Sequence, residues 1–151
     1  GAGESRNYLK RACHPVTGLS AEYAEFDGTP YQPVLDQWGG RHDWYYSDAY
    51  RTIANIALDY EWFAKDEWES ENVDRFLNFF CDTVQEKDRD GIFLTDGTIL
   101  EGKALRSMRR RHLPQTRKMH FSVSTVSGRH RFALGTEDIM TTVCISSHIW
   151  H

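Results

Sequence analysis

One segment, SDAYRTIANIALDYEWF from Ser47 to Phe63, constrains the fold more than any other. Its apolar residues recur every three or four positions, which is the spacing of one face of an α-helix. Ser47 is a suitable N-cap, so we expect the helix to begin there. The residues of the buried stripe are predicted to be Ala49, Ile53, Ile56, Ala57 and Tyr60.

Two more segments carry helical signals. The run Tyr8 to Cys13 indicates the end of a helix, which Pro15 and Gly18 would stop. A second apolar stripe at helical spacing is predicted to follow an N-cap at Ser70. Its members are Val73, Phe76, Leu77 and Phe80. We therefore expect an all-α fold.

Asp48 is the residue of the first helix that most suggests chemistry. It stands in the first turn, where the helix dipole favours a negative charge. Arg51 follows three residues later on the same side, so its charge favours the ionised carboxylate. Such a carboxylate can take a proton from water or accept an arginine fork. The alternative is a structural ion pair at an ordinary helix start, because aspartate is common in first turns.

The segment in front of this helix, HPVTGLSAEYAEFDGTPYQPVLDQWGGRHDWYYSD, is rich in glycine, proline and aromatic residues. Long connections without regular structure are uncommon in compact domains unless they carry function. Aromatic faces beside carboxylates and imidazole donors are suited to binding pyranose rings. The predicted substrate-binding residues are Tyr23, Phe26, Asp27, His42 and Tyr46. The alternative is that these side chains only pack the loop against the helices.

Four motifs, in the same order, carry a resemblance to a known family: SRNYLKRACHPVTGLSAEYAEFDGTP, SDAYR, IALDYEWFAKDEW and TDGTILEGKAL. Together they are similar to the later part of the catalytic domain of glycoside hydrolase family 8, most of all its reducing-end xylose-releasing exo-oligoxylanases. The resemblance covers about Glu4 to Leu105. It implies a partial (α/α)6 barrel and inverting hydrolysis of β-1,4-linked xylo-oligosaccharides. It also implies that Asp48 is the general base and Arg51 its supporting cation.

An inverting mechanism needs two carboxyl groups, one acid and one base, about 6.5–9.5 Å apart. The resemblance implies that the acid is a Glu located before the region equivalent to Gly1. We therefore expect the chain to be inactive on its own. Four other acidic residues are interpreted as loop or substrate-contact residues: Glu22, Glu25, Asp27 and Asp43. A non-catalytic sugar-binding or structural helical protein is the alternative function.

The sequence changes character after Leu105. Residues 1–105 contain 10 Lys/Arg and 20 Asp/Glu, whereas residues 106–151 contain 8 and 2. All three Met and five of the seven His also fall in the second part. This asymmetry indicates separate origins. We expect residues 1–105 to be the C-terminal part of a glycoside hydrolase catalytic domain and residues 106–151 to be an atypical, irregular basic tail.

We interpret this tail as out-of-frame sequence. In the family the motif Lys103-Ala104-Leu105 is followed by His, and Arg106 stands there instead. Suitable codons for GTEDIMTTVCISSHIWH, read from each third base, can spell YGRYYDNCLYLFSYLA, which is similar to the family's C-terminal helix. One insertion or deletion near residue 105 would explain the change in composition. The loss of that His leaves exo or endo action open.

Two other interpretations of the tail rest on weaker patterns. Its basic residues suit phosphate contacts, but the aromatic interleaving of a base-stacking surface is missing. Cys144, His148 and His151 have ligand-like spacing without a partner pair upstream, which is a weak zinc signal. We therefore expect no nucleic-acid partner, no metal and no cofactor. The expected partner is an oligosaccharide substrate, and the oligomeric state is open.

The expected environment follows from weaker signals. No run of about 18 apolar residues predicts a membrane span. Gly1 to Arg6 has no secretory pattern, and the three cysteines are scattered and odd in number, which fits a reducing compartment. We expect a cytoplasmic protein. Because a partial barrel leaves apolar faces without partners, we also expect marginal stability or aggregation.

Overall fold

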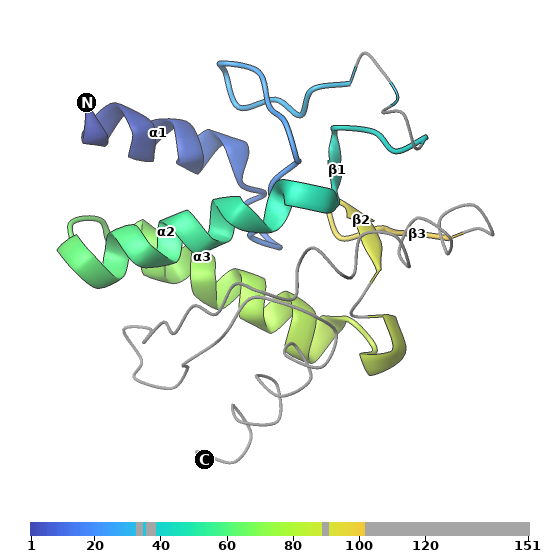
Figure 1. The fold of residues 1–151 in the computed structure, drawn as a ribbon. Helices are drawn as coiled ribbons and strands as arrows, with labels where there is room; N and C mark the ends of the chain where they lie inside the picture. Colours follow the sequence, from blue (N-terminus) through green and yellow to red (C-terminus); the bar gives the residue numbers. More distant parts are fainter. Residues whose placement is uncertain (33–34, 36–38, 89–90, 102–151) are drawn as a thin grey trace.

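The computed structural model describes residues 1–32, 35, 39–88 and 91–101 (Figure 1). The helices are α1 (Ala2–Ala12), α2 (Tyr50–Phe63) and α3 (Glu67–Asn78), with a 3-10 turn η1 (Ser47–Ala49), a π-helical turn η2 (Phe79–Thr83) and a 3-10 turn η3 (Glu86–Asp88). The strands are β1 (Trp44–Tyr45), β2 (Ile92–Leu94) and β3 (Ile99–Leu100). None of the helices in these ranges is long and apolar enough to cross a membrane. The predicted tail, residues 106–151, lies outside them.

α2 and α3 run in opposite directions and are joined by residues 64–66 (Figure 1). Ala64 ends α2 in the left-handed conformation, with φ 44°, and its backbone N–H donates to the Tyr60 carbonyl. Asp66 caps α3, because its side chain accepts a hydrogen bond from the Trp68 backbone N–H at 3.2 Å. The prediction of a Ser70 cap is therefore wrong. The helix begins one turn earlier, and Ser70 lies inside it, buried.

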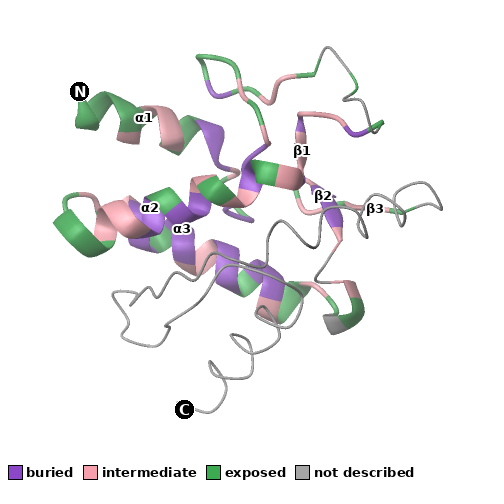
Figure 2. Cartoon of the chain, in the orientation of Figure 1, coloured by how far each residue is buried: buried purple, intermediate pink, exposed green. Residues whose placement is uncertain are grey.

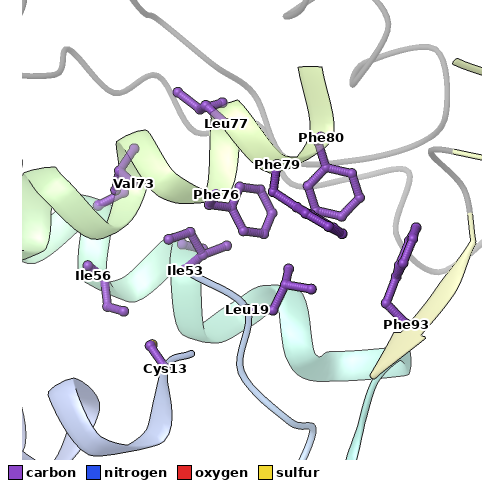
Figure 3. Close-up of a cluster of buried hydrophobic side chains, with 12 residues drawn as sticks. Cys13, Leu19, Ile53, Ile56, Val73, Phe76, Leu77, Phe79, Phe80 and Phe93 are labelled. Atoms are coloured by element: carbon purple, nitrogen blue, oxygen red, sulfur yellow. The ribbon is translucent and has the colours of Figure 1, made fainter. Parts of the chain in front are cut away.

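The core lies between α2, α3 and β2 (Figures 2 and 3). Both predicted helical stripes are confirmed, except that Tyr60 is only half-buried. Phe93 from β2 lies at one end of the cluster, and Leu19 from the N-terminal loop lies between Ile53 and Phe93. The largest fully buried side chains are Leu19, Ile56, Glu69, Asn72, Val73, Phe76 and Phe93. Burial of each large apolar side chain contributes about 1.5–3 kcal/mol, so this cluster holds the two helices together.

The expectation of an all-α fold needs a correction, because a small antiparallel sheet of order β1-β2-β3 flanks the helices. Trp44 pairs with Leu94, and Ile92 pairs with Leu100. Strands of two or three residues are too short to show an alternating pattern in the sequence. The sheet joins the start of α2 to the segment after α3, so it fixes where the chain enters α2.

α1 ends at Ala12, as the run Tyr8 to Cys13 predicted. It is attached to the helix pair by charged side chains. Arg6 forms a fork on Asp59 of α2, with N–O distances of 2.6 and 3.0 Å. Lys10 lies 2.6 Å from Asp66 at the start of α3. Directly beneath the fork lies Glu69 of α3, fully buried and 3.6 Å from the Arg6 Nε.

Candidate active site

The chain turns sharply between β1 and α2, and Asp48 stands in that turn. Tyr46 is extended, with φ −163° and ψ 159°, and is buried. Ser47 then has φ 51°, a left-handed backbone that residues other than glycine seldom adopt. The Ala49 N–H donates to the Tyr46 carbonyl at 3.1 Å and closes the turn. Ser47 makes no side-chain cap of α2, so that prediction is wrong; the 3-10 turn η1 precedes the helix instead.

Asp48 and Arg51 meet as the spacing predicts. The Arg51 Nη2 lies 3.3 Å from the Asp48 Oδ1, and the two side chains are 59% and 53% exposed. Arg51 also lies over the Tyr50 ring, 6.0 Å from its centroid. The Tyr50 side chain first, and the Asp48 carboxylate second, raise the pKa of Arg51. Asp48 is therefore a solvent-facing carboxylate beside a permanent cation, which is an arrangement that can accept a proton from water.

Tyr23 and His42 form a stacked pair. Their ring centroids are 4.2 Å apart, and the planes differ by 13°. The Glu22 Oε2 lies 2.7 Å from the His42 Nδ1, so the carboxylate fixes the orientation of the imidazole ring. Backbone N–H groups of Glu22 and Tyr23 donate to the Trp44 and His42 carbonyls, each at 3.0 Å. These bonds tie the Tyr23 segment to the strand that leads into the Asp48 turn.

Phe26 and Asp27 lie at the tip of a separate turn. Phe26 is 97% exposed. The Asp27 Oδ1 accepts the Thr29 N–H at 2.8 Å, and hydrogen bonds from Thr29 lower the pKa of Asp27. The Asp27 carbonyl accepts the Arg11 Nε at 3.2 Å. This turn is therefore held against α1, and Asp27 closes it. A substrate contact at Phe26 or Asp27 stays a prediction.

Tyr46 is buried, unlike the other predicted substrate-binding residues. It is buried against Ile92 of β2, and its ring meets Trp44 edge-on with centroids 6.2 Å apart. Its position fits an anchor of the turn, and a sugar contact there also stays a prediction. Asp43 is buried in a fork with Arg41, both N–O distances being 2.8 Å. Asp43 therefore stabilises the loop through its ion pair with Arg41.

Sequence reasoning missed two features of this site. The strained Ser47 backbone has no signal in the sequence, because serine is an ordinary residue before a helix. The Glu22 to His42 contact joins residues on separate segments, and no spacing rule connects them. Across the described ranges the structure shows no cluster of three or more His, Cys, Asp or Glu side chains that would hold a metal ion.

No protein-family model matches the chain. Three exo-oligoxylanases match it by sequence. Rex8A of Paenibacillus barcinonensis, a reducing-end xylose-releasing exo-oligoxylanase, is 57% identical over 81 residues, which are 54% of this chain and 20% of that protein. The reducing end xylose-releasing exo-oligoxylanase of Halalkalibacterium halodurans is 46% identical over 104 residues, which are 69% of this chain and 25% of that protein. The chain thus spans a quarter or less of the length of these curated relatives.

Solved structures give the same result. Rex8A complexed with xylose has a TM-score of 0.56 and 32% identity, covering 95% of this chain and 38% of that chain. A reducing-end-xylose releasing exo-oligoxylanase mutant complexed with xylobiose has a TM-score of 0.54 and 43% identity, covering 66% of this chain and 24% of that chain. The mainly helical fold with few strands matches these enzymes. The predicted resemblance is confirmed: the chain is a homologue of part of the reducing-end xylose-releasing exo-oligoxylanases.

Proposed function

We propose that this chain is the base-bearing part of an inverting glycoside hydrolase that cleaves β-1,4-linked xylo-oligosaccharides and releases xylose from their reducing end. The observation that carries the proposal is the exposed Asp48 carboxylate beside Arg51, on a turn held between β1 and α2. Homologues named for the release of xylose support the substrate class. The solved relatives complexed with xylose and xylobiose support an oligosaccharide as the partner.

In this proposal Asp48 is the general base. Its carboxylate takes a proton from a water molecule while the water oxygen attacks the anomeric carbon. A carboxylic acid on the other side of the sugar protonates the leaving oxygen, so the glycosidic bond breaks with inversion. Arg51, whose Nη2 lies 3.3 Å from the Asp48 Oδ1, is proposed to be the supporting cation beside the base. The stacked Tyr23 and His42 rings offer an aromatic face to a sugar ring.

The general acid is proposed to come from a segment outside residues 1–105. Of the four other acidic residues interpreted as loop or substrate-contact residues, three have carboxylates that are held by other groups of the loop. The Asp43 carboxylate is paired with Arg41, and that of Glu22 with His42. The Asp27 carboxylate accepts the Thr29 N–H and closes its own turn. Glu25 belongs to that same turn, where its backbone pairs with Thr29. The proposed complete enzyme would place these helices in an (α/α)6 barrel, of which α2 and α3 form one hairpin.

The stereochemistry of the product tests the proposed reaction. When the complete enzyme hydrolyses xylotriose, we expect the new reducing end to appear first as the α-anomer. Proton NMR recorded during the first minutes distinguishes the anomers before they interconvert. An initial β-anomer would contradict the inverting mechanism, and no release of xylose would contradict the substrate class. Cello-oligosaccharides of the same length serve as the matched control for the sugar.

Residues 106–151 are proposed to be out-of-frame sequence, which the nucleotide sequence tests. We expect a shifted frame across codons 100–151 to restore a His after Leu105, an apolar helix and the C-terminal helix of the family. The match in the curated relatives, 81 to 104 residues of the chain, is compatible with a break near residue 105. Stop codons in both shifted frames would contradict the proposal and make the basic tail genuine sequence. The DNA upstream of Gly1 should also encode a Glu-bearing helix.

A further inference from the structure

Two residues other than glycine have a left-handed backbone among those that the structure describes, Ser47 with φ 51° and Ala64 with φ 44°. They lie at opposite ends of α2. Ala64 has an ordinary reason, because a left-handed residue commonly ends a helix and its N–H donates to the Tyr60 carbonyl at 2.8 Å. Ser47 stands before a helix, where the backbone is normally extended. The strain at Ser47 therefore has no explanation in helix capping.

The strain is imposed by fixed points on either side. Tyr46 is extended and packed against Ile92, and Trp44 and Tyr45 are paired with β2. Ala49 is 2% exposed and begins the buried stripe of α2. The chain must therefore pass from an anchored strand to an anchored helix within two residues. A left-handed Ser47, with φ 51°, makes that reversal possible at the cost of backbone strain.

The consequence of the reversal falls on Asp48. Its neighbours Tyr46 and Ala49 are both buried, yet the Asp48 side chain is 53% exposed and meets Arg51. Strain of this kind concentrates where a reactive side chain is presented to solvent. The strained strand-to-helix turn that carries the nucleophile of α/β-hydrolases uses the same principle. Here the strained residue is the one just before the carboxylate.

We propose that Ser47 is a positioning residue, whose left-handed backbone sets the direction of the Asp48 carboxylate for proton transfer from water. This inference rests on the proposed function of Asp48. It depends on the backbone of Ser47 and not on its hydroxyl, because Ser47 is the N-cap of neither η1, which Tyr46 begins, nor α2, which Ala49 begins. A residue that tolerates a positive φ should therefore replace serine, and a β-branched residue should not.

Four variants of the complete enzyme test the inference: Ser47→Gly, Ser47→Asn, Ser47→Ala and Ser47→Val. Gly and Asn tolerate positive φ, so kcat should stay within about threefold of the wild type. Val should lower kcat by roughly a hundredfold, because a displacement of about 1 Å in a reacting group has that effect. KM should change little, since Asp48 acts on water. The kcat of Ser47→Ala should lie between those of Ser47→Asn and Ser47→Val. If Ser47→Val does not fold, Ser47→Ala still tests the inference.

Ala64→Val and Ala64→Gly are the matched controls, because they change the same kind of backbone at the other end of α2. Ala64→Val should lower the melting temperature as Ser47→Val does, with an unchanged kcat. An unchanged kcat in Ser47→Val, with Asp48→Asn inactive, would overturn the positioning role alone. Equal losses in Ser47→Gly and Ser47→Val would overturn it as well, since the hydroxyl would then be responsible. An active Asp48→Asn would instead overturn the proposed function.

Discussion

Replacing Asp48 by Asn in the complete enzyme should lower kcat for xylotriose by about a thousandfold, within the range of 10²–10⁴ that general-base catalysis typically contributes. Asparagine keeps the shape of the side chain but cannot take a proton from water. The side chain is 53% exposed and its one close charged partner is Arg51, so the fold should lose little stability. KM should stay within a few-fold, because the base does not hold the sugar. Xylose release measured by chromatography gives both constants.

Glu61→Gln is the control for this experiment. Glu61 is an exposed carboxylate in the last turn of the same helix, and we expect its removal to leave kcat unchanged. Turnover by Asp48→Asn above about a tenth of the wild-type rate would contradict the assignment of the base. In that case the Asp48 to Arg51 contact is a structural ion pair at a helix start, as the alternative interpretation of the sequence holds.

The stability of the 151-residue chain should fall as the pH rises from about 5 to 8, and Glu69→Gln should remove this dependence. Glu69 is fully buried, its Oε1 lies 3.6 Å from the Arg6 Nε, and its carboxyl group is hydrogen-bonded to that of Asp59. Burial first, and the adjacent Asp59 carboxylate second, raise the pKa of Glu69 from 4.5 to about 8, although Arg6 acts in the opposite direction. The folded chain therefore keeps a proton that the unfolded chain releases above about pH 4.5.

The direction in which stability changes with pH follows from the proton that Glu69 retains in the folded chain. Between pH 4.5 and 8 the folded state binds the proton and the unfolded state does not, so each rise in pH favours unfolding. This contribution to the free energy of unfolding is lost gradually as the pH rises through that range and is absent above about pH 8. Glu69→Gln should match the wild type near pH 4 and exceed it at pH 9, since a neutral amide needs no proton.

Urea unfolding followed by tryptophan fluorescence at pH 4, 6 and 9 measures this difference. Glu71→Gln is the matched control, because Glu71 lies two residues further along α3, 60% exposed and paired with Arg75 at 3.3 Å. Its removal should leave the pH profile unchanged. Asp59 gives the opposite pH dependence. Because the hydrogen bond from Arg6 lowers the pKa of Asp59, the stability from this pair is lost below about pH 4, in every variant. Equal stability of wild type and Glu69→Gln at pH 9 would contradict the prediction.

The sequence was most informative where contacts are local. The stripe from Ala49 to Ala57 predicted α2, and the stripe from Val73 to Phe80 predicted α3, because helical periodicity depends only on near neighbours. The contact between Asp48 and Arg51 followed from their spacing of three residues, although Asp48 lies in η1 and Arg51 in α2. The family resemblance was readable for the same reason, since its motifs are short and continuous.

Sequence reasoning failed where distant segments decide the structure. Ser70 and Asp66 are both suitable caps by residue type, and in the structure Asp66 caps α3 and also lies 2.6 Å from Lys10 of α1. From the sequence, Glu69 is an acidic residue in the first turn of a helix, where such side chains are normally exposed. The packing of α1 onto α2 and α3 buries it instead. No local pattern contains that information.

By itself the sequence determined the two core helices, the carboxylate and cation on the first turn, and the kinship with the exo-oligoxylanases. Only the tertiary structure decided that β1 pairs with β2, which lies about fifty residues further along the chain. That pairing fixes Tyr46, forces Ser47 into a left-handed backbone and turns Asp48 outward. Periodicity is a property of neighbouring residues, whereas strain and burial arise only when segments remote in sequence compete for the same space.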